Sequence, residues 1–473
     1  MADFSVIAQS PQVRDLVQQN VLQREFKDAL YPRNLFRGEA EPVEWPANIG
    51  DSMVFTGRGL MKPSTKPLRP GDEPKAKSVE YEQWSAQLHQ WVGRAPDIST
   101  VTDLVSIARL FVSNTQALGL DAGMSLNRIV RDRLYNAALS GQTVATVTAT
   151  SGHTITVARL NGFTTARRPD LSTGSAVKFD TVSSNNPLIA YTKNGGGAVF
   201  PLTITGFTPT YPGDEIGPGT LTVAETLSGS NVTARDPIWT ADASFINRAG
   251  AGLSVDSVTS TGHGFTFDLY RSSVGHMSDN NVPKMPDGYY HTHFNNYSKG
   301  QLFSSDESQR LLTSLPDYYW YKEFTIGEVL GGLVFEDTET PQASNVQGGS
   351  ANVYAGDPDF GEEFGGELKN NAGDLIQRPI FIGAEAVYEY YRPLGGLVTE
   401  AGVNGQVGEF TNLTNNGIEV NVDRVQVYLR APVNVTGDIV TSVWKSVMDW
   451  PCRTDSLTGD ASRFKRAICV EHI

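Results

Sequence analysis

Few side chains of this sequence have the types and spacing that metal chemistry requires. His291 and His293 could place two imidazoles on one face of a strand, because alternate strand residues share a face. A zinc site needs at least a third ligand, and no matching Cys, His or Glu stands near them. Asp357-x-Asp359-x-Gly361 resembles the start of a calcium loop, but its third ligand position is Gly and the terminal Glu is misplaced. We therefore predict no metal site.

The motifs of phosphate binding and covalent catalysis are also incomplete. Gly57–Lys62 and Gly195–Gly197 lack the full phosphate-loop and dinucleotide patterns, and no Gly-x-Ser-x-Gly turn occurs. Cys452 and Cys469 have no obvious activating neighbour, so we expect structural thiols. Paired carboxylates such as Glu362-Glu363 lie in loop-like sequence, where solvation is the ordinary state. These patterns predict no catalytic residue and no cofactor, and they favour a structural protein over an enzyme.

Size and charge narrow the class of protein further. The chain has 473 residues, 46 of them Gly and 25 Pro, which indicates many turns and strands in two to four subdomains. Its 52 acidic and 38 basic residues leave a formal net charge of −14. Because phosphate binding needs clustered Lys and Arg, this charge argues against a nucleic-acid-binding groove.

The N-terminus and the cysteine count bear on where the chain folds. Met1–Ile7 lacks the basic and apolar regions of a secretory signal. No apolar run approaches the roughly 20 residues of a membrane helix. Two cysteines in so long a chain do not form a disulfide framework, so folding in a reducing cytosol is expected.

The elements that would position functional groups begin with a helix and a hairpin. Pro11–Leu30 has apolar residues at helical spacing, typical of a packed helix or of an arm that reaches a neighbouring subunit. Asp51–Met61 and Val79–Val92 are rich in β-branched and aromatic residues, so they predict two strands. Four prolines and few groups to bury lie between them, which predicts a long hairpin with an exposed, semi-rigid tip. The tip is either a solvated loop or a docking segment for an acidic surface of another copy. Its candidate contact residues are Lys62, Lys66, Arg69, Lys75 and Lys77.

Two helices and a β-rich region follow. Thr100–Leu118 and Ser125–Leu139 each carry an apolar stripe at helical spacing, and Gly119 and Gly123 interrupt the pattern between them. Gly141–Gly262 then alternates and turns often, as a small all-β sandwich or barrel does.

The remaining sequence predicts mixed elements. They are a helix over Phe267–Met277, a strand over Tyr289–Phe294, a turn or short helix leading into a strand at Phe324–Glu336, a long surface loop over Thr338–Gln377, a strand at Ile380–Ile382, a short helix at Ala384–Tyr391, a strand over Val420–Leu429, either state at Ile439–Met448, and a last strand around Ile468.

This order of elements resembles that of the major capsid proteins of tailed bacteriophages. Local patterns at Pro286–Tyr290, Ile326–Thr338 and Ile380–Tyr388 also contribute to the resemblance. The resemblance implies an α+β, Hong Kong 97-type capsid fold with an all-β insertion domain. It implies these parts: residues 1–48 as N-terminal arm, 49–95 as E-loop hairpin, 96–140 as P-domain spine helices, 141–262 as inserted β domain, 263–418 as mainly A domain, and 419–473 as C-terminal strands returning to the P domain.

The resemblance also implies a function. The chain would self-assemble, as hexamers and pentamers, into the icosahedral shell that encloses a phage double-stranded DNA genome. Its acidic surface would lie near packaged DNA without sequence-specific contact. Scaffolding, portal and decoration proteins are possible partners, and no membrane is involved. The expected location is the virion capsid, with assembly in the host cytoplasm.

Two alternatives remain at this point. A glycan-binding, β-rich virion or extracellular protein would use aromatic side chains for sugar stacking, with Tyr289, Tyr290, Tyr318, Tyr319 and Trp320 as candidates. The predicted helices and the lack of a secretory signal argue against it. A hydrolase that uses loop carboxylates ranks third.

Overall fold

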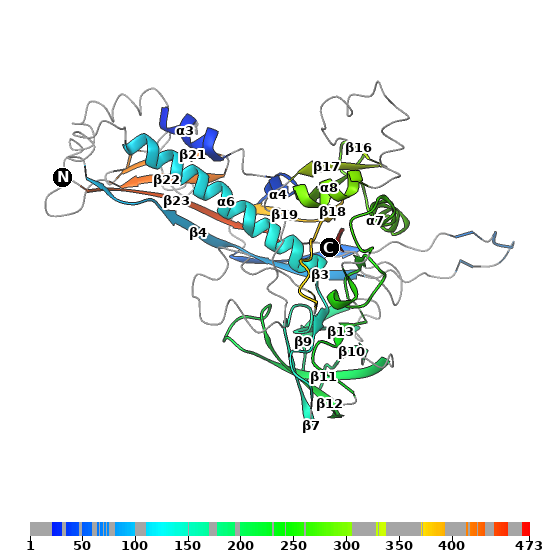
Figure 1. Ribbon diagram of the computed structural model, residues 1–473. Helices are drawn as coiled ribbons and strands as arrows, with labels where there is room; N and C mark the ends of the chain where they lie inside the picture. The colour runs from blue at the N-terminus through cyan, green and yellow to red at the C-terminus, as the bar shows by residue number, and fades with distance from the viewer. Residues whose placement is uncertain are drawn as a thin grey trace, which may run out of the picture. The chain divides into compact units, whose positions relative to one another are not determined.

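The computed structural model describes residues 21–30, 35–46, 50–58, 64–65, 67–69, 71, 73–74, 81–99, 110–149, 151–169, 177–193, 199–228, 231–241, 243–259, 262–304, 328–329, 331–336, 370, 372–392, 413–414, 417–422, 424–430, 439–452 and 466–473. They form a mixed α/β structure with mostly strands (Figure 1). The chain divides into two units. Unit 1 comprises Met1–Val54, Ser85–Arg131 and Val387–Pro451, and unit 2 comprises Phe55–Trp84, Asp132–Ala386 and Cys452–Ile473.

An eight-stranded sheet organises unit 1 around the long strand β23 (Ile439–Asp449). One edge of β23 pairs with β22 (Val425–Arg430) and then with β19 (Tyr388–Tyr391), and the other edge pairs with β4 (His89–Arg94). The outer strands are β5 (Ile98–Ser99), β21 (Gly417–Val422), β20 (Leu413–Thr414) and β1 (Glu41–Glu44), which runs parallel to β19. Two short N-terminal helices, α3 (Val21–Leu30) and α4 (Leu35–Gly38), also belong to unit 1.

Two expectations for this sheet are wrong. Ala384–Tyr391 is not a helix, because Glu385 adopts a φ of 55° and residues 388–391 pair as β19 on both edges. Val420–Leu429 is not one strand but a tight hairpin of β21 and β22, which turns at Arg424 with a φ of 68°. Both errors arise where a non-Gly residue takes the left-handed conformation, which a sequence pattern does not indicate.

One continuous helix, α6 (Leu110–Ala138), replaces the two helices expected on either side of Gly119 and Gly123. A glycine inside a helix costs only about 1 kcal/mol relative to alanine, so tertiary packing readily offsets it. Three residues of the apolar stripe predicted for its second half, Leu126, Val130 and Leu134, are fully buried, whereas Ile129 and Ala137 are half-buried. Residues 100–109, the start of the first expected helix, lie outside the described residues.

Gly119 has a packing role in unit 1. A methyl group added there would lie 2.8 Å from the carbonyl oxygen of Phe26 and 2.9 Å from Cβ of Ala29, both on α3. The missing side chain therefore lets α3 approach α6 closely.

We expect Gly119→Ala to lower the free energy of unfolding by about 1–2 kcal/mol, because overpacking exceeds the gain in helix propensity. Gly275, inside α7 (Phe267–Asp279), is the matched control, since an added methyl there meets nothing within 4 Å. Gly275→Ala should raise stability by up to about 1 kcal/mol. Urea unfolding of both variants measures the difference, and a stabilised Gly119→Ala would contradict the packing role.

A closed, six-stranded antiparallel sheet forms one part of unit 2. Its strands follow the order β6 (Gln142–Val144), β13 (Pro237–Thr240), β10 (Leu188–Lys193), β11 (Val199–Pro209), β12 (Gly219–Ser228) and β7 (Ser151–Val157). Hydrogen bonds from Thr146 N to Thr156 O (2.9 Å) and from Ala158 N to Val144 O (3.1 Å) join the first strand to the last. The sheet is therefore a barrel rather than a sandwich.

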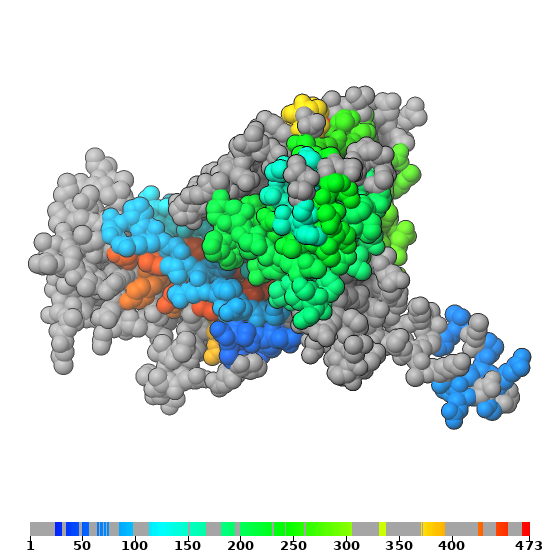
Figure 2. Space-filling model, turned by 90° about the horizontal axis from the view of Figure 1, so that it is seen from below, coloured from blue at the N-terminus to red at the C-terminus, as the bar shows by residue number. Residues whose placement is uncertain are grey.

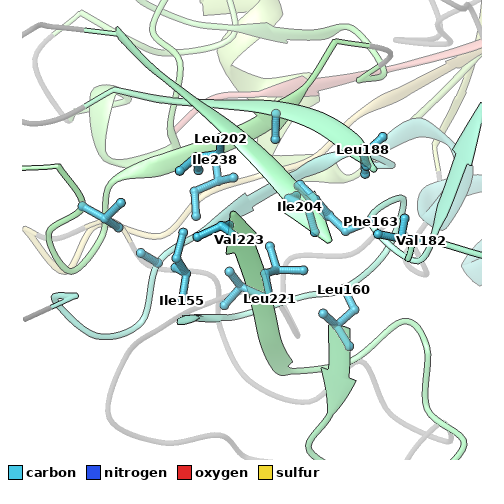
Figure 3. Packing of buried hydrophobic residues seen from close by; sticks show 14 of the residues in the cluster. Ile155, Leu160, Phe163, Val182, Leu188, Leu202, Ile204, Leu221, Val223 and Ile238 are labelled. Atoms are coloured by element: carbon cyan, nitrogen blue, oxygen red, sulfur yellow. The ribbon is translucent and has the colours of Figure 1, made fainter. Parts of the chain in front are cut away.

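The barrel has its own hydrophobic core (Figure 3). Alternate residues of each strand point inward, as the burial pattern of β12 shows. The outward residues contribute to the surface drawn in cyan and green in Figure 2, and Ile189 and Val199 are exposed. A separate hairpin, β8 (Thr165–Pro169) with β9 (Val177–Thr181), precedes β10. The core includes Ile155, Val157, Leu160, Phe163, Leu202, Ile204, Leu221, Val223 and Ile238.

A second six-stranded sheet in unit 2 has the order β14 (Ile246–Arg248), β24 (Ala467–Glu471), β18 (Ile380–Ile382), β15 (Tyr290–Phe294), β17 (Gly332–Glu336) and β16 (Glu328–Val329). The expected face of α7 is confirmed, because Tyr270 and Met277 are fully buried and Phe267 and Val274 pack against the same core. Helix α8 (Asn296–Ser304) and the short 3-10 helix η2 (Val255–Ser257) also belong to unit 2.

The segment after the barrel departs from the expected boundaries in two places. The barrel strands end at Thr240, and β14 already pairs with β24 of the second sheet. Residues 370–377 were expected to end a surface loop, yet Asn370, Ile376 and Gln377 are buried. Residues 337–369 of that loop lie outside the described residues.

Candidate assembly site

The predicted hairpin is present and is anchored at its base. Strands β2 (Ser52–Arg58) and β3 (Tyr81–Gln87) form their own two-stranded sheet. At the base, Leu88 N donates to Asp51 O (2.8 Å) and Gln87 N donates to the Asp449 carboxylate (2.9 Å). The chain then continues into β4, which pairs with β23. The base of the hairpin is therefore continuous with the large sheet of unit 1.

The tip exposes both apolar and basic groups. Leu68 is 57% exposed, and every described tip residue is exposed to solvent (blue in Figure 2). Arg69 is the one candidate contact residue that the structure describes, and it is exposed. Residues 62–77 contain five basic and two acidic side chains, hence a net charge of +3, against −14 for the whole chain. The other candidates, Lys62, Lys66, Lys75 and Lys77, lie outside the described residues.

A two-stranded sheet of this kind has little stability of its own. Isolated hairpins are marginal in water because they bury too little apolar surface to offset chain entropy. Val54 on β2 is 62% exposed, so the described part of the hairpin leaves an apolar side chain uncovered. Contact with another surface would bury these groups, which makes the hairpin a candidate for binding a second copy.

A buried ionic cluster lies in unit 1 and was not found from the sequence. Glu389 on β19 is 1% exposed and accepts from Arg37 (2.8 and 3.1 Å), Arg424 (2.6 Å) and the Trp450 indole (3.2 Å). These partners come from α4, the β21–β22 turn and the residue after β23. The only sequence signal was a carboxylate between Tyr388 and Tyr390, because its partners are distant in the chain.

The two histidines of the His-x-His pair contact a carboxylate and an aromatic ring. Nε2 of His291 lies 2.7 Å from a carboxylate oxygen of Asp287, and His293 is buried and stacks on Phe335. Within the described ranges, no group of three or more potential metal ligands occurs. The calcium-like segment at 357–361 and the carboxylate pair at 362–363 lie outside those ranges, as do Gly195–Gly197.

The cysteines have the properties of structural thiols. Neither cysteine forms a disulfide, and burial raises the pKa of Cys469 to about 12. A thiol with so high a pKa carries almost no thiolate at neutral pH and is a poor nucleophile. Sγ of Cys452 donates to the Arg133 carbonyl at 3.4 Å.

One of the aromatic residues proposed for sugar stacking is buried. Tyr290 is 2% exposed, and its hydroxyl donates to the Val282 carbonyl at 2.8 Å. It therefore cannot present its ring to a glycan. Tyr318, Tyr319 and Trp320 lie outside the described residues. No helix in the described part of the chain has the length and apolarity to cross a membrane.

A buried histidine lies at the end of β24. Nδ1 of His472 is 3.2 Å from the Ile473 carbonyl, which can only accept, so this nitrogen donates and Nε2 accepts from the Ser298 hydroxyl (2.8 Å). Burial is the main cause that lowers the pKa of His472 to about 4.

This shift predicts acid sensitivity of unit 2. The unfolded imidazole binds a proton below about pH 6.5, whereas the folded one resists protonation down to about pH 4. This contribution to the free energy of unfolding is therefore fully present above about pH 6.5. It falls as the pH drops, by about 3 kcal/mol in total once the pH is below about 4.

Urea unfolding between pH 7 and 4 measures this loss. His472→Gln should have a shallower pH dependence than the wild type in that window. Identical slopes in the wild type and His472→Gln would contradict the prediction.

Comparisons with known proteins find similar solved structures but no family match. The sequence matches no protein-family model and no curated protein sequence. Similar solved structures include the capsid of Ralstonia phage GP4 (12% identity, TM-score 0.41, 92% of this chain and 85% of that chain). The capsid of cyanophage P-SCSP1u has 11% identity and a TM-score of 0.40, covering 93% and 88% of the two chains. The capsid asymmetric unit of cyanophage Pam1 has 9% identity and a TM-score of 0.45, covering 94% and 92%.

Proposed function

We propose that this chain is the major capsid protein of a tailed bacteriophage, a subunit that self-assembles into the icosahedral shell around double-stranded DNA. The observation that carries the proposal is the β2–β3 hairpin, which is anchored in the unit 1 sheet at its base and exposed at its tip. Such a hairpin can link one subunit to the next while each subunit keeps its own folded core.

The energetics of repeated contacts support this use. A single exposed charge pair contributes only about 0–1 kcal/mol, so the basic tip alone would hold two subunits weakly. Burying apolar side chains such as Leu68 and Val54 against a neighbour adds to this, at up to about 1.5–3 kcal/mol each. Because each subunit of a shell makes many contacts at once, their combined avidity far exceeds that of one contact.

The parts of the chain take the following roles in the proposal. Residues 1–48 form an N-terminal arm, 49–95 the E-loop and 96–140 the spine helix. Residues 141–262 contain an inserted β domain, supported by the separate core of the barrel, whose strands end at Thr240. Residues 263–418 are mainly the A domain, and 419–473 return to the P domain. The subunit is not an enzyme and has no cofactor.

The assembled context completes the proposal. Subunits form hexamers and pentamers of a virion capsid that assembles in the host cytoplasm. They contact packaged DNA without reading its sequence, since the acidic chain does not favour phosphate binding. Scaffolding, portal and decoration proteins are the candidate partners.

Imaging tests this function directly. The full chain is expressed alone, purified and examined by electron microscopy over a range of salt and protein concentrations. Closed shells, capsomers or tubes are the expected products. Dispersed monomers under every condition, including co-expression with candidate scaffolds from the same source, would overturn the proposal.

A further inference from the structure

A small cavity in unit 2 lies where the barrel meets the second sheet. Its volume is about 30 Å³, and its lining includes Thr143 on β6, Arg248 on β14, Glu471 on β24 and Ser254 before η2. Two further guanidinium groups, those of Arg159 and Arg378, also line it. Three arginines and one glutamate are the charged residues of the described lining, so its formal charge is +2.

The glutamate is committed to two of these arginines. Glu471 is completely buried, and its carboxylate accepts from Nε of Arg248 at 2.6 Å and from Nη2 and Nε of Arg378 at 2.7 and 3.0 Å. Burial alone would raise the pKa of Glu471, but the charges and hydrogen bonds of the two arginines hold it below its usual value. The carboxylate is therefore ionised, and these three residues together carry a charge of +1.

The remaining donors of the two arginines differ. Arg248 uses Nη1 for the Leu253 carbonyl and Nη2 for Oε1 of Gln142, both at 3.0 Å. Nη1 of Arg378 has no acceptor among the described residues, although only 4% of this side chain is exposed. A buried guanidinium donor without an acceptor is costly, and it lies in a group that lines the cavity.

We propose that this cavity binds one monovalent inorganic anion of about the size of chloride. The volume exceeds the roughly 10–15 Å³ that a single water molecule needs but leaves little room for a larger oxyanion. A water molecule could accept from Arg378 but would not offset the charge of +1 that Arg248, Arg378 and Glu471 carry together. An anion accepts this hydrogen bond and also offsets the positive charge, so the charge of the lining favours an anion over water.

Binding would link the two sheets of unit 2. Arg159 follows β7 of the barrel and donates to the Asn136 side chain on α6, whereas Arg378 and Glu471 belong to the second sheet and the segment before it. An anion between these guanidinium groups lowers their mutual repulsion in the folded state only. Anions that fit the cavity should therefore raise the melting temperature with saturation.

Thermal unfolding of the full chain tests the site. Chloride or bromide is titrated against gluconate at constant ionic strength. We expect the melting temperature to rise by about 2–4 °C and then level off. Bromide should also give an anomalous scattering peak beside Arg378 in crystals grown from bromide.

A matched pair of variants at Ser254 separates anion binding from other salt effects. The Ser254 side chain makes no capping hydrogen bond, so its substitution breaks no contact of that kind. Ser254→Asp adds a fixed negative charge to the lining and should abolish the halide response, while Ser254→Asn has nearly the same shape and should keep it. Equal responses in chloride and gluconate for the wild type would overturn the proposal. A full halide response in Ser254→Asp, or no bromide peak at the cavity, would also overturn it.

Discussion

Deleting Ser64–Lys75 is expected to leave a folded subunit that no longer assembles into shells. The deletion removes the exposed tip but keeps the hydrogen bonds at the hairpin base, from Leu88 N to Asp51 O and from Gln87 N to Asp449. The described tip residues are exposed, so little core is lost. Circular dichroism should therefore be unchanged, and electron microscopy should show no closed particles.

Two further variants show which property of the tip matters. Replacing the same segment by Gly and Ser of equal length keeps the reach of the hairpin but removes Leu68, Arg69 and the basic residues. It should also block assembly. Shortening residues 170–176, between β8 and β9, is the control, because the proposal gives that segment no assembly contact, and it should leave particles intact. Normal particles from the tip deletion would refute the docking role of the hairpin.

The sequence predicted features that lie within one helix or strand better than contacts between distant segments. The face of α7 and the alternation within the barrel were predictable, because each depends on the spacing of apolar residues within one element. The continuity of α6 was not, because Gly119 is explained by α3, which lies far away in the chain. Periodicity shows where a side chain points but not what another segment places opposite it.

The same limit applies to the candidate sites. The hairpin and its basic tip were visible as two strands that flank a proline-rich segment. The clusters around Glu389 and Glu471 were not, since each joins residues more than 90 positions apart. An isolated Arg or Glu in a sequence is ordinarily a solvated surface charge, so only the tertiary structure identifies these as buried pairs.

Glu389→Gln is expected to lower the free energy of unfolding of unit 1 by about 3–5 kcal/mol. The substitution removes one member of a buried ionic cluster and leaves the Arg37 guanidinium, only 3% exposed, without its carboxylate. Arg424 is 28% exposed and can regain water, so Arg37 accounts for most of the loss. The effect is large because Glu389 holds α4, the β21–β22 turn and Trp450 around one carboxylate.

Urea unfolding of a matched series measures this loss. Glu336→Gln is the control, because Glu336 pairs with Lys299 at 2.7 Å but is 45% exposed, and such surface pairs contribute about 0–1 kcal/mol. The double variant Arg37→Met with Glu389→Gln removes the uncompensated charge and should recover part of the stability. A Glu389→Gln loss no larger than that of Glu336→Gln would show that the buried cluster does not stabilise unit 1. If the loss is large and the tip deletion still folds normally, stability and assembly reside in separate parts of the chain: the buried cluster maintains the subunit, and the exposed hairpin joins it to its neighbours.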